Sequence, residues 1–267
     1  MPPSSSQKSA IAQFVSVTGA KDSVATKCLK ANGWKVDQAI DDYFQNGQSG
    51  TVQEKTAAVN KIFDKYRDDP DSPDEIGING AMKYFGDLQV RLDEVACLAV
   101  AELLRSPSMG EFTREGFVEG WRGTTECDTI EKQASYANGL RKLLLDDPNY
   151  FRRVYRYTFL LCRMQGQRNV NIELAVEQWQ LFFTSENGGV AWETRSVPWL
   201  KWWIEFIETK HKRPINKDLW EQTEVLMRKT MEDESMDWWS SDAAWPGAID
   251  DFVAFVKEKQ GATAMQQ

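Results

Sequence analysis

Residues 242–255 read DAAWPGAIDDFVAF and lie close to the C-terminus of the chain. Pro246 favours the first turn of a helix, because its ring fixes φ and its missing N–H would have no partner there. Beyond it, apolar side chains recur at helical spacing and predict one buried stripe: Ile249, Phe252, Val253 and Val256. The other side of this helix carries Asp250, Asp251 and Ala254. We therefore expect a short anchored helix that displays carboxylates and small side chains.

The same helical spacing recurs through most of the chain. Clear apolar stripes run through residues 140–144, 172–183 and 199–207, and little of the sequence alternates as a half-buried strand does. Nine of the eleven tryptophans lie at or after Trp179. They predict a large aromatic core, or an aromatic-rich surface, built on helices. The fold class that follows is all-α, with a large helical domain over residues 55–260.

Residues 8–46 predict a separate small domain. Three short apolar helical stripes follow one another, divided by the turns Thr18-Gly19 and Asn32-Gly33. A domain of this size has a marginal core, and such modules typically bind a partner. Residues 1–7 are expected to form a disordered tail, and the polar, glycine-containing residues 47–54 a flexible linker.

Composition excludes several classes of function. The net charge of −8 argues against a nucleic-acid-binding protein, whose footprint is a basic surface. No apolar run approaches the ~20 residues that a bilayer span needs, so no membrane partner is expected. The first residues lack the basic and apolar regions of a signal peptide. We expect a soluble intracellular protein of the cytoplasm and nucleus.

The sequence predicts neither a cofactor, nor a metal site, nor a catalytic centre. The four cysteines are scattered, and His211 is the single histidine, so a zinc site of ordinary ligand spacing is not expected. We interpret the cysteines as small buried apolar groups and Cys127 as the one in a loop. No glycine-rich phosphate loop is present. The chemistry favours a helical binding protein that is not itself an enzyme.

Two helix–loop–helix outlines in residues 60–88 and around Phe112 suggest EF-hand geometry. If Ile78 takes the central hydrophobic position of the first loop, the sixth position holds Ile76 and the twelfth holds Met82, which excludes calcium. Centred on Phe112, the second loop places unsuitable residues at the ligand positions: Arg105, Pro107, Met109 and Gly116. We expect EF-hand-like units that do not bind calcium.

Two local patterns predict the end of one helix near residue 213 and the start of the next near residue 218. The basic residues 210–213 before Pro214 predict a helix C-terminus, which is the role we assign to His211. Asp218, followed by Glu221 three residues later, predicts a capping box that opens the next helix.

The N-terminal segment resembles a ubiquitin-associated (UBA-like) domain. The resemblance rests on the glycine turn, on Asn32-Gly33-Trp34 and on residues 37–44, DQAIDDYF. Where that fold commonly has a Met-Gly-aromatic loop, this chain has Val17-Thr18-Gly19-Ala20. The resemblance therefore implies a three-helix bundle with weak ubiquitin contact through Val17, Gly19 and Tyr43.

Five separate parts of the large domain carry a second resemblance: 76–80, IGING; 111–117, EFTREGF; 157–159, YTF; 211–213, HKR, with 217–220, KDLW; and 244–253, AWPGAIDDFV. The resemblance is to the potentiating-neddylation domain of the defective-in-cullin-neddylation family. It implies a non-catalytic co-ligase that helps transfer a ubiquitin-like modifier from its conjugating enzyme to a cullin lysine. The cullin's C-terminal winged-helix subdomain would be bound by Asp218, Ala244 and Asp250, with an insertion around residues 233–239 between the first two.

The same resemblance implies a second site, an apolar pocket for the acetylated N-terminal methionine of the conjugating enzyme. The matching positions are Ile78, Ala81, Phe85, Cys97, Leu98, Val100, Ala101, Leu104, Phe112, Leu161 and Leu181. Each of these could equally be ordinary core. Two alternatives remain open at this point: a calcium-regulated EF-hand adaptor, and a ubiquitin-binding adaptor that acts through residues 8–46.

Overall fold

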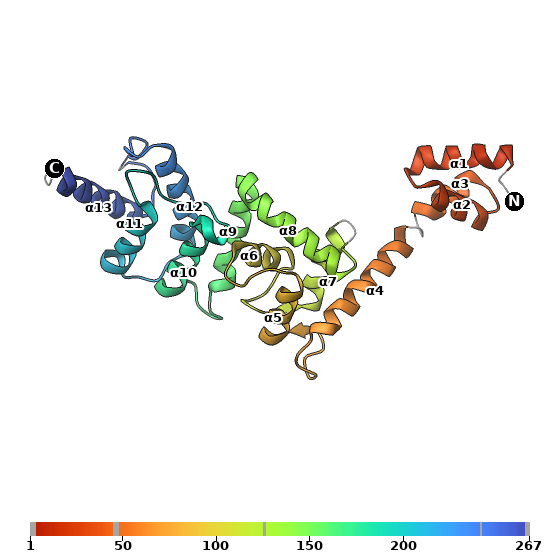
Figure 1. Cartoon of the computed structure of the whole chain (residues 1–267), viewed down its shortest axis with the longest axis horizontal. Coiled ribbons are helices and arrows are strands. Elements are labelled where there is room, and N and C mark those ends of the chain that lie inside the picture. Colours follow the sequence, from red (N-terminus) through yellow and green to blue (C-terminus); the bar gives the residue numbers. More distant parts are fainter. Residues whose placement is uncertain (1–3, 45–47, 125–126, 241, 265–267) are drawn as a thin grey trace. The chain divides into compact units, whose positions relative to one another are not determined.

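The computed structural model describes residues 4–44, 48–124, 127–240 and 242–264 of the chain (Figure 1). Helices dominate these residues, and extended backbone pairs only in the two-residue strands β1 (Glu75–Ile76) and β2 (Phe112–Thr113) and in one isolated bridge. The predicted all-α class is confirmed. The chain divides into two compact units, Met1–Lys61 and Ile62–Gln267, and each is described by itself.

The first unit begins with a three-helix bundle of α1 (Ser5–Thr18), α2 (Asp22–Ala31) and α3 (Val36–Asp42). Its core consists of small and aromatic side chains: Phe14, Ala20, Ala25, Leu29 and Ala39. Gly19 ends α1 in the left-handed conformation, with φ at 66°, as its place in the turn predicts.

Two segments expected to be irregular are helical instead. Ser4 caps α1 in a capping box with Gln7, so residues 5–7 belong to that helix and only residues 1–3 of the expected tail lie outside the described part. Helix α4 (Gln48–Tyr66) includes residues 48–54 of the expected linker, and residue 47 lies outside the described residues. Good helix formers such as Gln53, Glu54 and Lys55 favour extending α4 in this direction.

The second unit opens with α5 (Ile78–Asp87), α6 (Val95–Leu103) and α7 (Arg114–Gly123). Strand β1 pairs antiparallel with β2, and Ile76 lies opposite Phe112. The expected register, with Ile78 at the centre of the first loop, is wrong. Ile76 is fully buried and paired, whereas Ile78 begins α5 and is 60% exposed. Two isoleucines separated by one residue offered the same local pattern, and the pairing with Phe112 decides between them.

Glycines occupy the ends of both loops. Counting from Ile76 and Phe112, the twelfth loop positions are Gly80 and Gly116, where a calcium loop has a bidentate glutamate. A Cβ atom on Gly80 would collide with the carbonyl oxygen of Tyr66, and one on Gly116 with that of Leu104. The described residues hold no group of three or more His, Cys, Asp or Glu side chains that could bind a metal ion. The kinship of these two units to EF-hands stays a prediction.

The remaining helices form the C-terminal part of the second unit (Figure 1). They are α8 (Ile130–Asp146), α9 (Pro148–Cys162), α10 (Ile172–Phe182), α11 (Trp199–Phe206), α12 (Lys217–Glu232) and α13 (Gly247–Ala264). A short 3-10 turn, Ser185–Asn187, follows α10, and a π-helical turn, Ile207–His211, extends α11. His211 thus lies at a helix end, as the basic run predicts. Of the helices in the described ranges, none has the length and apolar composition of a membrane span.

Aromatic side chains fill the core of this part. Trp179, Trp192, Trp199, Trp203 and Trp220 are completely buried, so of the two expectations for the tryptophan-rich third, the aromatic core is correct for these residues. The predicted stripe of α13 is also confirmed, since Ile249, Phe252, Val253 and Val256 are all buried.

Candidate partner-binding face on α12 and α13

A chain of buried rings fixes α12 and α13 in place. Tyr155 of α9 stacks on Trp220 of α12 with ring centroids 4.7 Å apart, and Trp220 stacks on Trp179 of α10 at 5.8 Å. Trp179 meets Trp203 of α11 at 5.5 Å, and Trp203 meets Phe252 of α13 edge-on at 5.0 Å. The helices that carry Asp218 and Asp250 are therefore held by one aromatic core.

Hydrogen bonds fix the orientation of three rings in this stack. Tyr155 donates its hydroxyl proton to the carbonyl of Trp220 at 2.8 Å, and the indole N–H of Trp220 donates to the carbonyl of Tyr155 at 3.0 Å. The indole N–H of Trp179 donates to the Tyr155 hydroxyl at 2.9 Å. Burial raises the pKa of Tyr155 well above its ordinary value, so the phenol stays neutral. The polar side-chain atoms of Tyr155, Trp179 and Trp220 thus all have partners, whereas the indole N–H of Trp203 is buried without one among the described residues.

Asp218 lies in the first turn of α12 and is exposed. The predicted capping box is wrong, because Asn216 is the N-cap and its side chain accepts the backbone N–H of Leu219 at 2.8 Å. Asn is as good a cap as Asp, and it stands two positions earlier. Within the described part of the chain, the Asp218 carboxylate makes no hydrogen bond and no ion pair. It is free to meet a partner while its charge still suits the helix N-terminus.

The loop between α12 and α13 is ordered by its own side chains. The carboxylate of Asp233 accepts the backbone N–H groups of Ser235 at 2.9 Å and of Asp237 at 3.2 Å. The hydrogen bonds with Ser235 lower the pKa of Asp233. Met236 is buried and anchors the loop in the core. This loop contains residues 233–239, where the family resemblance predicts an insertion.

Two consecutive tryptophans link this loop to α13. Trp238 donates its indole N–H to the carbonyl of Asp233 at 3.3 Å and packs on Trp245 with ring centroids 5.4 Å apart. Trp239 donates its indole N–H to Oδ1 of Asp250 at 3.0 Å. Sequence reasoning did not single out Trp239 as a site residue. The pair Trp238-Trp239 was the signal that the sequence offered, and the contact of Trp239 with Asp250 depends on the course of the loop between them.

Ala244 and Asp250 lie on the segment that leads into α13. Ala244 is exposed, and its neighbour Trp245 is half-buried against Trp238. Asp250 is in the first turn of α13 and half-buried. Helices α12 and α13 pack against each other. The arrangement offers carboxylates at the starts of two helices that pack against each other, and a methyl side chain where a partner's backbone can approach closely.

The residues predicted to form an apolar pocket are mostly core. Ile78 is exposed and Cys97 and Leu181 are half-buried. The other eight are buried: Ala81, Phe85, Leu98, Val100, Ala101, Leu104, Phe112 and Leu161. Phe85 and Phe112 lie in contact, with ring centroids 5.7 Å apart. Burial raises the pKa of the Cys97 thiol to about 12, so this half-buried position is uncharged.

Two comparisons with known proteins bear on this geometry. Residues 132–255 match the family described as Cullin binding, and residues 8–50 match the UBA-like domain. Defective in cullin neddylation protein 1 of Pyricularia oryzae is 34% identical, over 97% of this chain and 96% of its own length. The protein of the same name from Yarrowia lipolytica is 34% identical, over 93% of this chain and 96% of its own. The one from Saccharomyces cerevisiae is 26% identical over 96% of each chain.

The chain belongs to the defective in cullin neddylation family. The segment that matches the cullin-binding family contains Asp218, Ala244 and Asp250. Of the predicted pocket residues, only Leu161 and Leu181 lie within that segment. The UBA-like fold of the N-terminal bundle is confirmed. The individual roles of the site residues stay predictions.

In this family member the positions predicted for ubiquitin contact lie at two places in the bundle. Val17 is 56% exposed at the end of α1, beside the left-handed Gly19. Tyr43 is half-buried and packs edge-on against Phe14 with ring centroids 5.4 Å apart. Ubiquitin contact at these residues stays a prediction.

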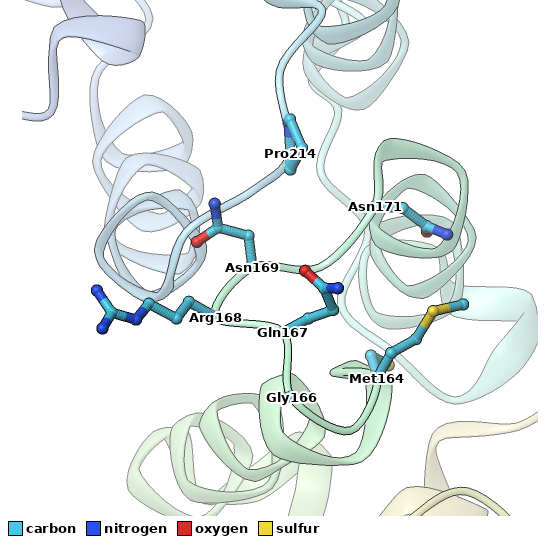
Figure 2. Close-up of a pocket in the computed structure, with 8 residues that line it drawn as sticks. Met164, Gly166, Gln167, Arg168, Asn169, Asn171 and Pro214 are labelled. Carbon is cyan, nitrogen blue, oxygen red and sulfur yellow. The ribbon is translucent and has the colours of Figure 1, made fainter.

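An open cavity of about 490 Å³ lies between the α9–α10 loop and Pro214 (Figure 2). Its lining includes the polar residues Gln167, Arg168, Asn169 and Asn171 beside Cys162, Met164 and Pro214. In Figure 2 the Arg168 side chain extends outward, on the side opposite Met164 and Asn171. An antiparallel bridge between Val170 and Ile215 joins the two segments. The cavity shares no lining residue with either predicted site.

Asn216 caps α12 and Asp218 does not, so the two residues are expected to differ in their effect on stability. We expect Asn216→Ala to lower the free energy of unfolding by about 1 to 2 kcal/mol, because it removes the cap of α12. Asp218→Ala is expected to cost clearly less, since its carboxylate has no partner within the described chain. Urea unfolding of the full chain measures both. A larger loss for Asp218→Ala than for Asn216→Ala would contradict the assigned cap.

Proposed function

We propose that this protein is a non-catalytic co-ligase for cullin neddylation. It binds the C-terminal winged-helix subdomain of a cullin through Asp218, Ala244 and Asp250. It binds the acetylated N-terminus of the conjugating enzyme through the apolar pocket of the second unit. The observation that carries the proposal is the match of residues 132–255 to the cullin-binding family, combined with the exposed carboxylate of Asp218 at the start of α12 and the half-buried one of Asp250 at the start of α13.

The chemistry of the α12–α13 face suits a basic partner surface. Carboxylates at Asp218 and Asp250 pair with lysine or arginine side chains of the cullin, and such pairs set specificity and association rate. The methyl group of Ala244 permits close approach between the two backbones. The net charge of −8 further favours encounter with a basic partner.

The pocket chemistry explains why acetylation would matter. The residues predicted to line it are apolar, and the half-buried Cys97 is neutral because burial raises its pKa. Moving a free ammonium group into such a pocket costs several kcal/mol, whereas an acetyl-amide brings no charge. Acetylation of the conjugating enzyme thus acts as a switch of affinity.

Transfer of the modifier then needs no catalytic residue on this protein. Holding the cullin and the charged conjugating enzyme together raises the effective concentration of the acceptor lysine near the thioester and restricts its orientation. The burial of the thiols supports this account. Burial raises the pKa of Cys162 to about 12, which disfavours the nucleophilic thiolate.

Replacing Ala244 by Arg together with Asp250→Lys tests the cullin face. The double variant places two cations and a bulky side chain where the proposal needs carboxylate and space, so cullin affinity is expected to fall by at least about 100-fold. Titration calorimetry with the cullin C-terminal domain measures the loss, and circular dichroism checks the fold. The matched control is Asp251→Lys, an exposed neighbour expected to stay within about threefold of the wild type. Undiminished affinity of the double variant would refute the cullin face.

Peptides from the N-terminus of the conjugating enzyme test the pocket separately. We expect the N-acetylated peptide to bind at least about 10-fold more tightly than the same peptide with a free amine, because only the latter buries a charge. Fluorescence anisotropy on the full chain measures both affinities. An acetylated peptide of scrambled sequence controls for non-specific binding. Equal affinities of the acetylated and free peptides would exclude the pocket and leave the cullin face untouched.

A further inference from the structure

The indole of Trp239 lies along one face of α13. Its N–H donates to Oδ1 of Asp250 at 3.0 Å, and the ammonium group of Lys257 stands 4.9 Å from the centre of its ring. Asp250 and Lys257 are about two helical turns apart, so they point to the same side of the helix. Ala254 stands between them on that side, and its methyl group leaves room for the ring. The indole therefore bridges two charged groups of α13.

Contacts of Met236 and Trp238 within the loop hold Trp239 in place. Its backbone N–H donates to the carbonyl of Met236 at 3.0 Å, and Met236 is buried in the core. The preceding Trp238 is fixed by its contact with Trp245 and by its hydrogen bond to the carbonyl of Asp233. The lysine above the ring adds a cation–π interaction. The direction of the Trp239 N–H is thus set before any partner arrives.

We propose that Trp239 is a positioning residue for cullin binding, which it serves by orienting the carboxylate of Asp250. The proposal rests on the function proposed above, in which Asp250 binds a basic side chain of the cullin. With Oδ1 held by the indole N–H, the carboxylate cannot rotate freely, and Oδ2 stays available for the cullin. Fixing a contact residue in its bound geometry reduces the ordering cost of association.

The loop between α12 and α13 therefore supports the proposed binding residues. Trp238 packs against Trp245, which is next to Ala244, and Trp239 holds Asp250. A carboxylate near the first turn of a helix would otherwise be free to swing toward the backbone N–H groups of that turn. The hydrogen bond from the Trp239 indole competes with the backbone N–H groups for the Asp250 carboxylate and keeps it directed along the side of α13 that carries Ala254 and Lys257.

Substituting Trp239 by Phe removes the N–H donor and keeps an aromatic ring beneath Lys257. We expect this variant to bind the cullin C-terminal domain about 3- to 10-fold more weakly, because the Asp250 side chain must then be ordered on binding. The matched control is Trp202→Phe on α11, whose half-buried ring also lies beneath a lysine of α13, Lys259 at 5.8 Å, but lies outside the loop that holds Asp250; its affinity is expected to stay within about twofold. Calorimetry on the full chain measures affinity, and thermal unfolding confirms that both variants fold.

A double-mutant cycle separates positioning from general loss of structure. If Trp239 acts through Asp250, Trp239→Phe has no further effect on cullin affinity once Asp250 is replaced by Ala. Unchanged affinity of Trp239→Phe, together with a large loss for Asp250→Ala, would overturn the positioning role and leave the proposed function standing. Equal losses from Trp239→Phe in both backgrounds would also overturn it. Full affinity of Asp250→Ala would instead remove the proposed function itself.

Discussion

The stacking of Tyr155, Trp220, Trp179, Trp203 and Phe252 is the contact on which the functional face depends. It joins α9, α10, α11, α12 and α13 through rings whose centroids lie between 4.7 and 5.8 Å apart. Buried aromatic contacts are large and directional, so they restrict how the helices cross as well as how tightly they pack. Asp218 and Asp250 stand at the starts of two helices whose buried sides contain Trp220 and Phe252. The same two helices supply the anchor and the proposed binding groups.

Periodicity predicted the parts of this arrangement that are local to one helix. The buried stripe of α13 and the outward-facing Asp250, Asp251 and Ala254 follow from spacing alone, because one helix has only one way to bury Phe252 and Val253 together. Local capping chemistry was less decisive. Asn216 and Asp218 are both good caps, and only the path of the chain after the bridge at Ile215 makes Asn216 the cap.

Contacts between distant segments were beyond sequence reasoning. The choice between Ile76 and Ile78 depends on pairing with Phe112, which is far away in the chain. The hydrogen bond from Trp239 to Asp250 depends on the course of a loop that has no periodic pattern. The positions of Ala244 and Asp250 on the binding face came from the resemblance to a family and not from physics, because exposed acids in a first turn are common. Residues 5–7 of the expected disordered tail belong to α1, because Ser4 caps that helix.

In the proposed function this protein is a bridge, with one face for the cullin, one pocket for the conjugating enzyme and no covalent chemistry of its own. The most direct test is the rate of modifier transfer to the cullin lysine as the concentration of this protein is raised at fixed amounts of both partners. A bridge predicts that the rate rises, reaches a maximum and then falls, because at excess each partner occupies a separate copy. No acceleration at any concentration, or a rate that rises to a plateau and stays there, would contradict the account.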